Sequence, residues 1–98
     1  MTITVNEEKK ALTVRLTGRL DTTTAPEAEE KLTALLDGMK DVTLDLNGLE
    51  YISSAGLRVL MTLHKKMNGQ GRMQLTGVNE TVQEIFDLTG FSEILTIV

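Results

Sequence analysis

The chain has 98 residues, of which 41% are hydrophobic and 24% charged, and its formal net charge is −4. This size and composition predict a single domain over residues 1–98, too small for a deep enclosed active site, which disfavours an enzyme. Because the chain has no cysteine and only one histidine, a bound metal or cofactor is disfavoured. The acidic net charge disfavours binding to nucleic acid. The sequence has no long apolar run, so we expect a cytoplasmic protein with no membrane contact.

The first third of the chain predicts a β-hairpin followed by a helix. Apolar residues alternate with polar ones over residues 3–5 and again over residues 12–16, with a polar segment between them. Thr24 and Glu27 then fit a capping box, in which each side chain hydrogen-bonds to the backbone at the start of a helix. Leucines at helical spacing continue this helix until Asp37 and Gly38 end it.

The remaining two thirds alternate between strands and helices. The patterns predict a strand over 42–46 that ends at Asn47-Gly48, a helix over 53–67, a strand near 73–75, a helix over 80–88 and a short closing strand over 94–98. We therefore expect an α/β (α+β) fold with a single mixed β-sheet of about five strands and helices packed on it. The strand over 42–46 is a candidate for the sheet centre, because the most apolar helix follows it.

The loop before that apolar helix is where we expect a functional site. Ser53 and Ser54 stand at the predicted helix start, followed by free backbone N–H groups. A phosphate on Ser54 would meet the positive end of the helix dipole, so the fold could accept the added charge. Gly56 removes a side chain from the first turn, which would let a partner's backbone or a nucleotide come close.

A simpler interpretation is that both serines only cap the helix, since serine is a common capping residue. The one histidine, His64, lies on the apolar stripe of the same helix. It cannot serve Ser54 as a base, because ten helical residues separate the two by about 15 Å. A serine hydrolase is therefore disfavoured, and the sequence contains no nucleophile elbow, Walker loop or dinucleotide-binding motif.

Three segments together resemble a STAS domain of the anti-sigma factor antagonist family. They are GRLDTTTA before the first helix, VTLDLNGLEYISSAGLRVL across the strand, loop and second helix, and EIFDLTGFSEIL near the C-terminus. The resemblance covers nearly the whole chain and places the family's phosphorylated serine at Ser54. Ser53 stands where the family has an acidic residue, and Ala55 where it has a second hydroxyl.

The resemblance implies a partner-switching role in signal transduction and transcription regulation. The unphosphorylated protein would bind an anti-sigma factor that is also a serine kinase, and so free a sigma factor. Phosphorylation at Ser54 would block binding, and a metal-dependent, PP2C-like serine phosphatase would restore it. In this role the chain is a substrate and not an enzyme.

We expect the partner-binding surface to surround Ser54. It comprises Asp21, Thr22, Thr23, Tyr51, Ile52, Ser53, Ala55, Gly56, Arg58 and Thr62, with Tyr51 and Ile52 supplying apolar contact. One alternative is a STAS scaffold subunit of a stress-sensing or lipid-transport assembly that is never phosphorylated. Another is a small enzyme or ligand-binding protein with a polar pocket near Ser54 and Asp45.

Overall fold

Strands and helices alternate along most of the chain in the computed structural model, which describes residues 1–98. The elements are β1 (Thr2–Glu8), β2 (Ala11–Leu20), α1 (Ala25–Leu36), β3 (Asp41–Ile52), α2 (Ser54–Asn68), β4 (Arg72–Thr76), α3 (Glu80–Thr89) and α4 (Phe91–Ile94). None of these helices combines the length and the apolar composition needed to cross a membrane.

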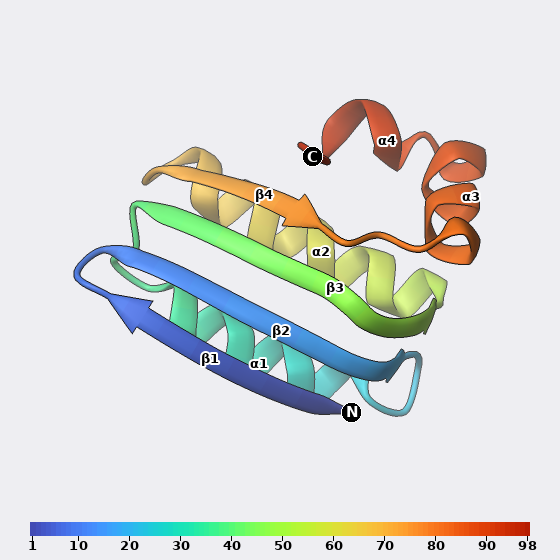
Figure 1. Ribbon diagram of the computed structural model, residues 1–98, viewed down its shortest axis with the longest axis horizontal. Helices are drawn as coiled ribbons and strands as arrows, with labels where there is room; N and C mark the ends of the chain where they lie inside the picture. Colours follow the sequence, from blue (N-terminus) through green and yellow to red (C-terminus); the bar gives the residue numbers. More distant parts are fainter.

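The four strands form one mixed sheet in the order β1-β2-β3-β4 (Figure 1). β1 and β2 are an antiparallel hairpin, whereas β2, β3 and β4 run parallel to one another. The predicted α+β class, the hairpin and the interior place of β3 are confirmed. Because β2 and β3 are parallel neighbours, their carboxyl ends and the segments that follow lie at the same edge of the sheet.

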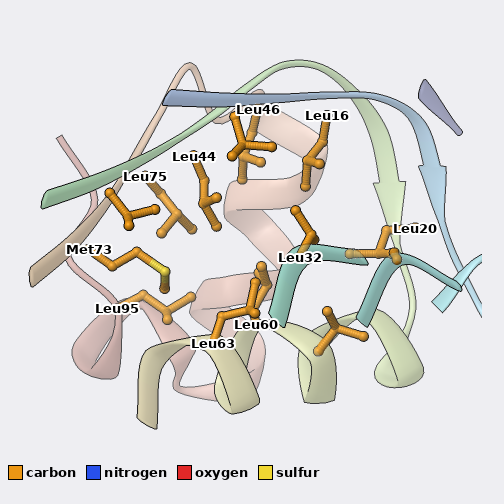
Figure 2. Packing of buried hydrophobic residues seen from close by; sticks show 14 of the residues in the cluster. Leu16, Leu20, Leu32, Leu44, Leu46, Leu60, Leu63, Met73, Leu75 and Leu95 are labelled. Atoms are coloured by element: carbon orange, nitrogen blue, oxygen red, sulfur yellow. The ribbon is translucent and has the colours of Figure 1, made fainter. Parts of the chain in front are cut away.

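The core lies between one face of the sheet and helices α1 and α2, which cover that face together (Figure 1). Leu44 and Leu46 of β3 line the sheet side of this core, and Leu60 and Leu63 of α2 line its helix side (Figure 2). All four side chains are fully buried, and burial of one such side chain contributes about 1.5–3 kcal/mol. The opposite face carries polar side chains, among them Thr13, Arg15, Thr43 and Asp45.

β3 is longer than the sequence pattern predicts. It does not end at Asn47-Gly48 but continues to Ile52, so that only Ser53 separates it from α2. A bulge makes this possible, because two residues of β3 stand opposite one residue of β2 between the pairs Arg15–Asp45 and Thr17–Gly48. In a regular strand, residues three positions apart point to opposite faces. The bulge places both Leu46 and Leu49 on the buried face, so β3 continues along the core beyond residue 48.

The C-terminal segment departs from the predicted fifth strand. α3 forms as expected, but Gly90, with φ of 82°, ends it and leads directly into α4. Of the strand predicted over 94–98, only an isolated parallel bridge between Leu75 and Ile97 remains. The sheet therefore has four strands, and the C-terminal residues hydrogen-bond along the outer edge of β4.

Candidate functional site

The segments after β2 and after β3 are joined directly at the carboxyl edge of the sheet. Leu20 and Ile52 are paired in register at the ends of the two strands. The Ser53 backbone N–H donates to the Leu20 carbonyl oxygen at 2.9 Å. The structure thus places the predicted residues 21–23 and 53–55, which follow these two strands, at the same edge of the sheet, although about 30 positions separate them in the chain.

The two adjacent serines have different surroundings. Ser53 is the N-cap of α2, with extended backbone, and its side-chain oxygen accepts from the Gly56 N–H at 3.3 Å. Ser54 is the first residue of the helix and is exposed, and its hydroxyl has no hydrogen-bond partner within the chain. The capping interpretation is therefore correct for Ser53 and wrong for Ser54.

Two residues expected at the partner-binding surface are buried instead. Ile52 is 1% exposed, so it packs in the core and cannot supply apolar contact to a partner. Gly56 is buried as well, and a Cβ added there would lie 2.7 Å from both the Leu20 carbonyl oxygen and the Ile52 Cγ1. The space left by Gly56 is filled by the chain itself and is closed to a partner's backbone or a nucleotide.

The turn between β2 and α1 is organised by the Asp21 carboxylate. Its Oδ1 accepts from the backbone N–H groups of Thr23 at 3.0 Å and Thr24 at 3.1 Å. The predicted capping box is wrong, because the Thr24 hydroxyl donates back to the Arg19 carbonyl oxygen and makes no cap hydrogen bond. The backbone N–H of Thr24 is the main cause that holds the pKa of Asp21 below its ordinary value of 3.8, and that of Thr23 adds to it.

The contribution of Asp21 to stability is expected to depend on pH. Its pKa is lower in the folded than in the unfolded chain, so the stabilisation is complete above about 3.8 and is lost as pH falls through the folded value. Thermal unfolding of the wild type and of Asp21→Asn should therefore differ at pH 7 and converge under acid conditions. A difference that stays constant down to pH 3 would contradict this electrostatic role.

Arg19 is a residue of this site that the sequence motifs do not single out. Its guanidinium lies 4.6 Å from the centre of the Tyr51 ring, and its Nε is 3.6 Å from the Asp21 carboxylate. Tyr51 is half-buried beneath this contact, so part of the residue stays exposed. The alternation along β2 could have placed Arg19 on the outer face, but only the parallel register shows that it pairs with Tyr51.

A shallow groove between α1 and α2 extends the site along the outer surface of the helices. It has a volume of about 430 Å³, and its lining includes the predicted residues Ala55, Arg58 and Thr62. α1 contributes Pro26 and Glu29 from the facing side. A second, smaller cavity lies between β1 and α1. Neither is lined by Ser54 or Asp45, so the pocket of the ligand-binding alternative has no counterpart here.

The sequence matches the STAS domain family over residues 2–98. A relative from Bordetella bronchiseptica, named as the anti-sigma factor antagonist BtrV, is 35% identical, and the match covers 99% of this chain and 85% of that protein. The crystal structure of a Thermotoga maritima protein described as an anti-sigma factor antagonist superposes with a TM-score of 0.89 at 21% identity, covering 97% of this chain and 84% of that one.

A further structural match is the Bacillus cell fate determinant SpoIIAA in its phosphorylated form. Its TM-score is 0.74 at 15% identity, and the match covers 99% of this chain and 91% of that one. At such identity these structures bear on the fold alone. With the family match over almost the whole chain and the 35% identical relative, the chain belongs to the STAS domain family, among its anti-sigma factor antagonists.

Proposed function

We propose that this chain binds an anti-sigma factor through the surface around Ser54, and that phosphorylation of Ser54 switches the binding off. The observation that carries the proposal is the contrast between the two serines. Ser53 is occupied in capping α2, whereas the Ser54 hydroxyl is exposed and has no partner in the chain. The 35% identity to a protein named as an anti-sigma factor antagonist supports the choice of partner.

Phosphorylation requires only the hydroxyl from this chain. The Ser54 Oγ attacks the γ-phosphorus of ATP held by the anti-sigma factor, which in this scheme is also a serine kinase. The bond from that phosphorus to the β–γ bridging oxygen breaks, ADP leaves, and the hydroxyl proton passes to a base of the kinase. This chain is therefore the substrate of the reaction and has no catalytic role of its own.

A phosphate on Ser54 is compatible with the folded chain but opposes binding to the anti-sigma factor. At the first position of α2 the added charge of about −1.5 to −2 meets the positive end of the helix dipole, so the helix does not melt. In the complex the same charge would be desolvated against a surface that accepts a neutral hydroxyl, which is costly. Binding is lost without a change of fold.

The switch is reversed by hydrolysis of the phosphoserine, in which water displaces inorganic phosphate and restores the hydroxyl. We assign this step to a PP2C-like serine phosphatase. Both reactions take place in the cytoplasm, where bacterial sigma factors meet RNA polymerase.

The contacts that select the partner come from exposed residues around Ser54. They are Thr22, Thr23, Arg58 and Thr62, together with the half-buried Tyr51.

The test is phosphorylation by a kinase-type anti-sigma factor that binds this chain. After incubation with ATP, mass spectrometry should locate one phosphate on Ser54. Ser54→Ala should remain unmodified, whereas Ser53→Ala should still accept phosphate at Ser54. Stable binding with no phosphate on Ser54 would refute the switch and favour the scaffold alternative.

A further inference from the structure

Arg58 stands one helical turn after Ser54 on α2. Residues four apart lie on the same face of a helix, with Cβ atoms about 5–6 Å apart. Long side chains in a helix lean toward its N-terminus, so the side chain of Arg58 can extend from the groove to the turn that contains Ser54. Both residues are exposed, and at this spacing an arginine side chain can reach a group attached to the Ser54 oxygen.

Arg58 is also free of other charges. The ion pairs in the chain are Arg19–Asp21, Lys66–Asp37 and Arg72–Asp41. Glu29 of α1 lines the same groove as Arg58 but forms no ion pair with it. Arg19, the other arginine of the site, is already engaged by Asp21 and by the Tyr51 ring. Of the two arginines at this surface, Arg58 is thus the one that is free to form an ion pair with a new anion.

We propose that Arg58 is the counter-charge that holds a phosphate on Ser54, a role that rests on the phosphorylation proposed above. The guanidinium presents paired N–H donors that match phosphate oxygens, which a lysine ammonium does not. In the unphosphorylated chain Arg58 faces the groove and is available to a partner. Phosphorylation then alters the partner-binding surface twice, by adding a charge at Ser54 and by withdrawing Arg58 from the groove.

The experiment measures the second ionisation of phosphoserine installed at position 54 during protein synthesis. Phosphorus NMR follows this ionisation, whose pKa is ordinarily about 6. With Arg58 present the pKa should lie about 0.2–0.4 units lower than in Arg58→Gln, because an i, i+4 ion pair of this kind favours the dianion. Arg58→Lys should recover only part of the shift.

Lys65→Gln is the matched control. Lys65 lines the same groove, so the variant removes the same charge from the same helix face. It lies eleven residues after Ser54, roughly 16 Å along the helix and beyond the screening length of about 8 Å at physiological salt. The pKa of the phosphoserine in Lys65→Gln should therefore match that of the wild-type phosphoprotein.

Equal pKa values with Arg58 and with Gln at position 58 would overturn the proposal. An equal change in Lys65→Gln would also overturn it, because the effect would then be one of net charge. The phosphate is installed without a kinase, so these outcomes do not depend on whether a kinase modifies Ser54. Failure of this inference is thus distinguishable from failure of the proposed function.

Discussion

Ser54→Asp is expected to weaken binding to the anti-sigma factor by about 150-fold, which corresponds to about 3 kcal/mol. The carboxylate places a permanent negative charge where the interface accepts a hydroxyl, and its desolvation opposes the complex. The melting temperature should hardly change, because Ser54 is exposed and its hydroxyl makes no hydrogen bond within the chain. Isothermal titration calorimetry with the anti-sigma factor and thermal unfolding of the free chain measure the two effects.

Ser53→Ala and Ser54→Ala provide the controls for this prediction. Ser53→Ala removes the N-cap hydrogen bond to Gly56 and should cost about 1 kcal/mol of stability. Ser54→Ala removes only an exposed hydroxyl and should keep both stability and partner binding. If Ser54→Asp lowered the melting temperature as much as Ser53→Ala does, Ser54 would have a structural role after all.

Gly56→Ala should destabilise the chain by about 2 kcal/mol even though alanine is the better helix former. The new Cβ would lie 2.7 Å from the Leu20 carbonyl oxygen, and backbone at that point cannot move aside without disturbing the hydrogen bond from Ser53. For a chain of this size the loss corresponds to a fall in melting temperature of about 8–16 °C. Urea denaturation and thermal unfolding both measure it.

Gly69→Ala tests whether the effect at Gly56 comes from crowding. Gly69 lies at the other end of α2, and a Cβ there would meet only the Lys66 carbonyl oxygen, at an ordinary 3.7 Å. The stability of Gly69→Ala should stay within about 0.5 kcal/mol of the wild type. Equal losses at Gly56 and Gly69 would contradict the close packing of α2 on the ends of β2 and β3.

Local patterns were sufficient to predict most of the fold. Alternation at Leu12, Val14 and Leu16 identified β2, and the apolar stripe from Leu57 to Met67 identified α2. Both patterns are clear because only one face of each element packs against the core. The local patterns failed where pairing with a segment distant in the sequence determines the structure. β3 passes the expected stop at residues 47–48 because β2 pairs with it through a bulge, and no local signal shows that partner.

The candidate site was predicted less completely than the fold. The resemblance carried by ISSAGLRVL singled out Ser54, and the family match identifies the chain as a STAS domain. Ile52 and Gly56 belong to the same motif but face inward, which residue type alone does not reveal. Arg19 was missed because its role depends on Tyr51, which is 32 positions away in the chain.

The sequence by itself determined the class of fold, the family and the position of the hydroxyl pair, since these depend on periodicity and on a local motif. Only the tertiary structure decided which serine is free. Ser53 is held by its backbone hydrogen bond to Leu20 and by its cap to Gly56, and Ser54 is thereby the first exposed residue of α2. The physical reason is that burial and hydrogen bonding at this edge are set by how β2, β3 and α2 meet.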